Sequence, residues 1–207
     1  MNDKIRKIIF QIESLKQELE SVLNEQDLLY RVEGTRIEFE EKFKQTHQLL
    51  REGLFQWFKS SKPRNVLSAP IIYSMIVPMV VFDLAITLYQ HACFRLYQIP
   101  RVNRGDYLVF DRHHLAYLNL MQKINCVYCS YGNGLLSYAR EVSARTEQYW
   151  CPIKHARKIV DPHERYLYFT AFGDAEAFQS GKLAFREALR KGDIPIVDID
   201  DVSDRNE

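Results

Sequence analysis

Apolar residues near the N-terminus recur at intervals of three and four positions. They are Ile5, Ile8, Ile12, Leu15, Leu19 and Val22, and Gln26 and Leu29 extend the series. This spacing is typical of the seam of a coiled coil, with Lys, Glu and Gln on the remaining faces. It predicts a helix over residues 4–33.

A second helix is predicted directly afterwards. Gly34 is well placed to terminate the first helix. Thr35 and Glu38 then form the T-x-x-E pattern of a capping box, which predicts a helix over residues 36–61. The two helices form a predicted antiparallel hairpin. It either packs on the rest of the chain or presents its seam to a protein partner or to a second copy of the chain.

The next feature is a long apolar segment. No residue from Asn65 to Phe82 is charged, Asp83 interrupts, and no further charge occurs before Arg95. A transmembrane helix needs about 20 mostly apolar residues, so the segment reaches this length only by including Asp83. An aspartate at the bilayer centre costs about 3 kcal/mol on insertion scales, which the apolar residues on both sides can offset.

Two further observations leave the nature of this segment open. Basic residues flank it equally, as Arg51, Lys59, Lys62 and Arg64 on one side and Arg95, Arg101, Arg104 and Arg112 on the other. The positive-inside rule therefore gives no orientation. Pro70 and Pro78 disfavour helical angles in the residues before them. A membrane span, a re-entrant or interfacial hairpin, and a buried helix pair of a soluble core all remain open.

The rest of the chain predicts short elements around a cysteine-containing turn. Residues 107–110 favour a strand, and a helix is expected from Arg112, with Asp111 as its cap. A turn over the sequence CVYCSYGNG and a helix ending at Cys151-Pro152 follow. After Gly173-Asp174 we expect one more helix, and then a loose acidic tail.

Charge and composition exclude few classes of function. The net charge of +1 provides no global field that would attract nucleic acid. The N-terminal residues resemble no secretory signal, so we expect a cytosolic environment in which thiols stay reduced. In such an environment the four cysteines favour metal binding or redox chemistry over a disulfide framework.

The candidate chemistry is a zinc site. Cys126 and Cys129 form a C-x-x-C pair, and Cys151 and His155 form a C-x-x-x-H pair whose side chains lie one helical turn apart. Two such pairs make the four tetrahedral ligands of a structural zinc ion, provided that a helix and its return lie between them. Glu147, one turn before Cys151, is a candidate hydrogen-bond partner for a ligand.

Other uses of the same residues remain open. Cys126 and Cys129 alone form a candidate redox pair, or all four cysteines, with Cys93, hold an iron–sulfur cluster. The cysteines also fit simple packing as small apolar groups. If His155 is not a ligand, Glu147 or His113 can approach an open metal position, which would indicate a hydrolytic enzyme. Of the neighbouring His113 and His114, one is expected to point away from the other, and His47, His91 and His163 have no evident partner.

Familiar catalytic motifs are missing from the sequence. It has no P-loop, dinucleotide fingerprint, serine-hydrolase elbow or H-E-x-x-H pattern. The stretches CVYCSYGNG and EQYWCPIKHA make residues 70–165 similar to an uncharacterised group of bacterial proteins. That resemblance implies a bacterial protein and supplies no mechanism.

Together these features predict a mainly α fold of four segments. They are a helical hairpin (1–62), an apolar membrane-associated segment (63–98), a Cys/His module (99–160) and a helical extension with an acidic tail (161–207). We expect a zinc-binding protein of structural or partner-binding role, in contact with membrane lipid and not with nucleic acid. Its location would be the cytoplasmic face of the bacterial inner membrane, or the cytoplasm. The alternative is a soluble thiol-redox or metal-dependent hydrolytic enzyme.

Overall fold

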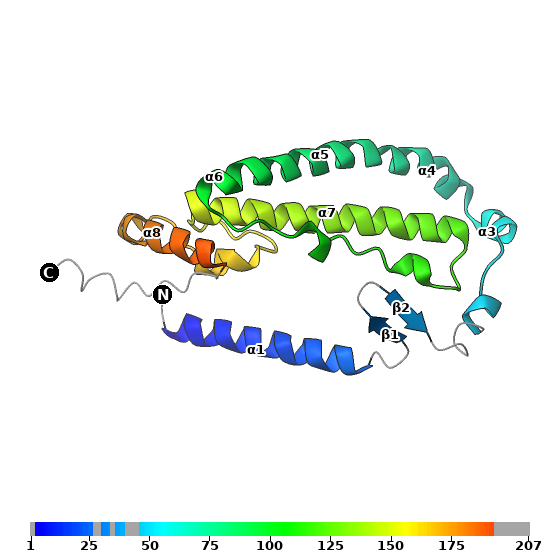
Figure 1. Cartoon of the computed structure of the whole chain (residues 1–207), viewed down its shortest axis with the longest axis horizontal. Coiled ribbons are helices and arrows are strands. Elements are labelled where there is room, and N and C mark those ends of the chain that lie inside the picture. The colour runs from blue at the N-terminus through cyan, green and yellow to red at the C-terminus, as the bar shows by residue number, and fades with distance from the viewer. Residues whose placement is uncertain (1–2, 27–29, 34–35, 40–45, 193–207) are drawn as a thin grey trace. The chain divides into compact units, whose positions relative to one another are not determined.

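The described part of the chain is mostly helical, which confirms the predicted mainly α fold (Figure 1). A computed structural model describes residues 3–26, 30–33, 36–39 and 46–192. Its α-helices are α1 (Asp3–Gln26), α3 (Leu54–Ser60), α4 (Pro63–Ser74), α5 (Ile76–Tyr89), α6 (Arg95–Tyr97), α7 (Leu120–Trp150) and α8 (Ala175–Lys191). A π-helix, η1 (Gln90–Phe94), joins α5 to α6, and 3-10 turns occur at η2 (Arg104–Asp106), η3 (Arg112–His114) and η4 (Glu164–Tyr168).

The N-terminal region differs from the predicted helical hairpin. Helix α1 confirms most of the first helix, but strands β1 (Tyr30–Glu33) and β2 (Arg36–Phe39) pair antiparallel where the second helix was expected to begin. Tyr30 lies opposite Phe39 and Val32 opposite Ile37. These aromatic and β-branched residues favour extended structure, and this preference outweighs the capping pattern. The predicted terminator Gly34 and residues 40–45 lie outside the described residues.

The apolar segment is helical, as predicted, and of the arrangements left open it forms a single helical run without a hairpin. Pro63 begins α4, where a missing N–H is harmless, and Pro70 lies inside that helix. The only interruption is at Met75, between α4 and α5. Pro78 has no N–H to donate to the carbonyl of Ser74, so the helical hydrogen-bond ladder is broken at this point. Of the two prolines expected to disturb the helix, only Pro78 therefore coincides with an interruption, at Met75.

By their contacts, the residues form two compact units. Unit 1 comprises Val77–Leu108 and Gly132–Glu207, and unit 2 comprises Asn2–Ile76 and Val109–Tyr131. In unit 2, Tyr128 Oη donates to the carbonyl of Ile72 over 2.7 Å, and Tyr73 Oη donates to Asn125 Oδ1. The end of α4 is thereby held against the first turns of α7.

In unit 1, α5 runs in the same direction as the C-terminal part of α7 (Figure 1). Met79 approaches Gly132 near one end of this contact, and Tyr89 Oη lies 2.9 Å from Thr146 Oγ1 farther along. Gly134 serves a different neighbour, since a Cβ there would stand 2.5 Å from the carbonyl oxygen of Tyr107. Glycine at this position lets the segment before Val109 cross directly over α7.

Helix α7 replaces several predicted elements. The sequence CVYCSYGNG is helical throughout, so the predicted turn is wrong. The helix begins after Asn119, which forms a capping box with Gln122: each accepts a hydrogen bond from the backbone N–H of the other. The helix predicted from Arg112 is only the short turn η3, and Asp111 makes no side-chain cap there. The end of α7 at Trp150, before Pro152, is as predicted.

The remaining predictions have mixed outcomes. Residues 108–111 form no strand, since Leu108 is buried beside Gly134 in an irregular crossing. Helix α8 is confirmed, with Asp174 accepting a hydrogen bond from Ala177 N and Gly192 ending the helix at φ 81°. The apolar face of α8 contributes Phe185 and Leu189 to the core of unit 1. The acidic tail lies outside the described residues.

Candidate membrane-contacting surface

The outer face of α5 is apolar and exposed, and it continues through η1 and α6 to Leu96, past the exposed polar residues His91 and Arg95. Its large side chains are Val77 (64% exposed), Val80 (43%), Val81 (62%), Leu84 (61%), Leu88 (68%) and Leu96 (76%). They recur at the three- and four-residue spacing of one helical face. The helical run Pro63–Tyr97 is long and apolar enough to cross a membrane by length and composition. We call the outer face of α5, η1 and α6 the apolar face.

The inner face of the same helix carries polar side chains beside apolar ones such as Met79 and Phe94. Asp83, Thr87 and Gln90 lie at successive turns and point toward α7 and the segment that follows α6. Asp83 and Gln90 are buried, with residue exposures of 9% and 2%. Valine and leucine side chains, which a soluble protein usually turns inward, also lie on the outer side of this helix.

Arg104 neutralises the single charge of the helix. Its Nε lies 3.1 Å from Asp83 Oδ1, and its Nη2 lies 2.6 Å from Oδ2, which makes the contact bidentate. The Asp83 side chain is only 12% exposed, whereas that of Arg104 is 44% exposed. Such planar pairing is the strongest ionic contact available to a carboxylate. The charge that interrupts the apolar sequence therefore faces the protein.

Gln90 ties the helix to the following segment through its amide group. Its Nε2 donates to the carbonyl of Val102 over 3.2 Å, and its Oε1 accepts from Val102 N over 3.0 Å. Nε2 also donates to Tyr138 Oη, which lies 3.4 Å from Thr87 Oγ1. Gln90 is the first residue of the π-helix, a widened turn that is frequent where a side chain has a special task. These bonds fix which face of the helix is turned inward.

Helix α7, which carries Tyr138, also takes part in a network of ion pairs. Glu141 Oε1 accepts from Arg145 Nε (2.8 Å) and from Arg165 Nη2 (2.9 Å), and the Arg165 side chain is only 8% exposed. Burial alone would raise the pKa of Glu141, but the hydrogen bonds from both arginines outweigh burial and hold that pKa below its usual value. Glu141 and Arg145 lie one helical turn apart on α7, and Arg165 of η4 joins them.

The predicted zinc ligands do not form a cluster. Cys126 and Cys129 lie inside α7 in unit 2, whereas Cys151 and His155 follow α7 in unit 1. The spacer between the two pairs was expected to hold a helix and its return, but residues 130–150 are all helical. Within the described ranges, no three His, Cys, Asp or Glu side chains are close enough together to hold a metal ion. The zinc site, and likewise the iron–sulfur cluster, stays a prediction from spacing.

The redox interpretation has no geometric support. Cys126 and Cys129 form no disulfide and lie three residues apart inside a helix. Cβ atoms at this spacing are about 5–6 Å apart, whereas a disulfide needs about 3.8 Å. Burial, together with the neighbouring carboxylate of Glu147, raises the pKa of the Cys151 thiol and so disfavours its thiolate.

Several other candidate residues have partners that the sequence did not indicate. Glu147 accepts from His163 Nε2 over 2.9 Å, so His163 has a partner after all. The other nitrogen of His163, Nδ1, accepts from Tyr166 N at the start of η4, which assigns the ring proton to Nε2. The rings of His113 and His114 lie side by side with centroids 4.0 Å apart, contrary to the expectation that one points away.

No family model, curated protein or solved structure matches the chain. The site is therefore described from its own geometry. Sequence reasoning found the apolar helix and Asp83 but missed Gln90, Arg104 and Tyr138. The spacing of Asp83, Thr87 and Gln90 could have identified the inward-facing side of this helix, because it places three polar residues on one stripe of a mostly apolar sequence.

Proposed function

We propose that the protein is a non-enzymatic membrane-surface protein that inserts the apolar face of α5, η1 and α6 into one leaflet. The observation that carries this proposal is the exposed apolar outer side of the helix, together with the inward direction of its buried polar side chains. Its polar side chains are used in contacts with its own unit, while its leucines and valines are left outside. In water this arrangement exposes a large apolar surface, which is typical of a surface that contacts lipid or a partner.

The inner contacts favour a helix that lies along the membrane over one that crosses it. The segment of unit 1 from Val77 to Tyr97 is bound to α7, which carries Glu141 and Arg145. Carrying such charges into the bilayer centre costs about 3 kcal/mol for each residue. A helix immersed on one side only, to a depth of about 5–10 Å, leaves these charges in water.

The remaining parts of the hypothesis concern partners and place. Helix α1 has an exposed apolar stripe that includes Ile12, Leu15 and Leu19, and it supports a partner-binding role. The bacterial resemblance supports the cytoplasmic face of the inner membrane as the location. A zinc ion at Cys126, Cys129, Cys151 and His155 is not needed for this function.

The test uses the folded full-length chain and preformed vesicles of neutral phosphatidylcholine. We expect the protein to float with the vesicles in a density gradient without prior detergent, because a surface helix needs no assisted insertion. Protein that stays at the bottom of the gradient refutes membrane contact. Protein that associates only after reconstitution from detergent indicates a spanning segment and refutes the in-plane arrangement.

A further inference from the structure

The end of the apolar face carries an aromatic cluster. The ring of Tyr97 in α6 stacks on that of Tyr149 at 5.1 Å and meets the ring of Trp150 edge-on at 5.4 Å. Trp150 is 50% exposed, although indole rings are usually well buried. Tyrosine and tryptophan are enriched at the headgroup level of membranes, where one end of the side chain is apolar and the other is wet.

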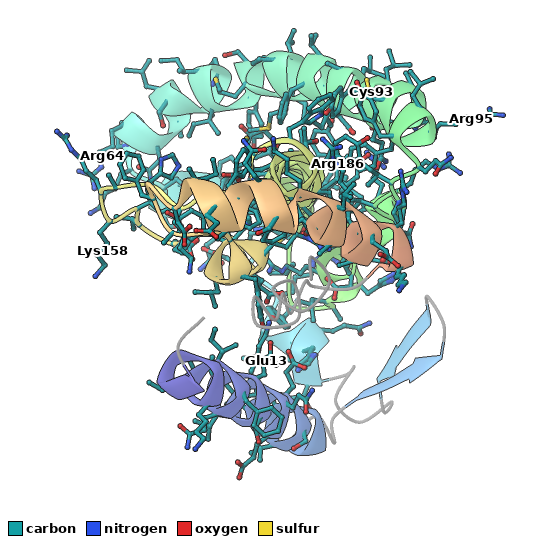
Figure 2. All side chains as sticks on the ribbon, turned by 90° about the vertical axis from the view of Figure 1, so that its left-hand side faces the viewer. Glu13, Arg64, Cys93, Arg95, Lys158 and Arg186 are labelled. Atoms are coloured by element: carbon teal, nitrogen blue, oxygen red, sulfur yellow. The ribbon has the colours of Figure 1, made fainter. Side chains whose placement is uncertain are left out.

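One basic side chain contacts this cluster, and two others come from chain segments at the same end of α7, where Arg145, one turn before Tyr149, donates to the carbonyl of Pro100 over 2.7 Å. Arg186 of α8 lies over the Tyr149 ring at 4.6 Å and donates from Nε to the carbonyl of Tyr149. Arg95 precedes Tyr97 by two residues and extends away from the ribbon in Figure 2. Arg95 and Arg101 are exposed, and in the described part of the chain neither makes an ion pair.

Acidic residues are excluded from the same stretches. No Asp or Glu occurs from residue 84 to residue 105, nor from residue 148 to residue 160. The nearest acidic residue of α8, Glu187, pairs with Lys191 at 3.1 Å. A chain with a net charge of only +1 thus concentrates uncompensated positive charge beside its exposed tryptophan.

We propose that Arg95 and Arg101, beside the aromatic cluster of Tyr97, Tyr149 and Trp150, bind the anionic headgroups of the lipid surface. This inference rests on the proposed function and names the lipid class. With the helix lying along the membrane, the cluster between α6 and α7 lies on the headgroup side of the immersed leucines, and the long side chains of the two arginines reach the phosphates there. Each basic residue at an anionic surface strengthens binding about fivefold, so the pair contributes about 30-fold at low salt.

The experiment measures binding of the full-length chain to neutral phosphatidylcholine vesicles and to vesicles that also contain phosphatidylglycerol. The test variant is Arg95→Gln/Arg101→Gln. The matched control, Arg157→Gln/Lys158→Gln, removes the same charge from exposed positions in the same unit. We expect the test variant to lose about 30-fold in affinity for anionic vesicles and to keep wild-type binding to neutral ones. The control should keep most of its preference for anionic vesicles.

Three results overturn the inference while leaving the proposed function standing. The wild-type chain could bind both kinds of vesicle equally, or the two double variants could lose anionic binding to the same extent. Inorganic phosphate could also compete more strongly than chloride of equal ionic strength, which would assign the arginines to a soluble anion. Failure to bind neutral vesicles, in contrast, refutes the proposed function itself.

Discussion

Replacing one leucine on the apolar face tests the membrane assignment directly. Leu88 is 68% exposed in the folded protein, and full burial of a leucine contributes about 2 kcal/mol. Transfer of its exposed two thirds into lipid then contributes about 1.4 kcal/mol, which corresponds to about a tenfold change in partitioning. Leu88→Ser should therefore weaken binding to neutral vesicles about tenfold. The double variant Leu84→Ser/Leu88→Ser should weaken it about 100-fold if the effects add.

The control and the assay keep this prediction specific. Leu183 on α8 is 76% exposed but lies outside the apolar face, so Leu183→Ser should leave vesicle binding unchanged. All three side chains already face solvent, and their loss should change the free energy of unfolding by less than about 0.5 kcal/mol. Vesicle titration with sedimentation measures the partition coefficients. The reasoning is refuted if the double variant binds like the wild type, or if Leu183→Ser weakens binding as much as Leu88→Ser.

Three further predictions concern the packing of unit 1 and the metal hypothesis. Gly134→Ala should lower the free energy of unfolding, measured in urea, by about 2 kcal/mol or more, because the new Cβ meets the backbone of Tyr107 and Leu108. In Gly132→Ala the new Cβ meets only the flexible end of the Met79 side chain, so this variant should be neutral or stabilising. Equal effects of the two variants would contradict this packing. Glu141→Gln should cost about 3 kcal/mol at pH 7, because buried Arg165 loses its carboxylate. The lowered pKa of Glu141 means that its contribution is present above about pH 4.5 and is lost as the pH falls through the folded-state pKa, so the variant's stability should depend less on pH in acid. The zinc hypothesis predicts about one equivalent of metal in elemental analysis of protein never exposed to chelator, and a substoichiometric trace would reject it.

The glycines of the predicted turn show why local pattern misled the analysis. Gly132 and Gly134 usually indicate a break, yet both lie inside α7. Gly134 is needed because another part of the chain, at Tyr107, crosses within contact of the helix. This requirement comes from a neighbour that local sequence does not identify. The strand predicted over residues 107–110 was wrong for the same reason, since those residues follow the surface of α7 rather than a partner strand.

The zinc site illustrates the limit of spacing arguments. Two ligand pairs at suitable intervals can bind one ion only if the chain folds back between them. No local sequence pattern indicates whether the chain does so. The spacer is instead a continuation of α7. The pairing of Val32 with Ile37 was also missed. The same few residues fit either a helix cap or a β-hairpin, and the choice depends on whether the two short segments pair with each other.

The sequence by itself determined the mainly α fold, the extent of the apolar helix, the C-terminal ends of α7 and α8, and the presence of one carboxylate inside the apolar segment. These features follow from periodicity, proline and capping residues, which act within a few positions along the chain. Only the tertiary structure decided which side of the apolar helix faces the protein. That choice depends on partners distant in sequence: Arg104 bonded to Asp83, and Tyr138 bonded to Gln90. Burying those polar groups together leaves the leucines outside, because a helix has only one face to turn inward.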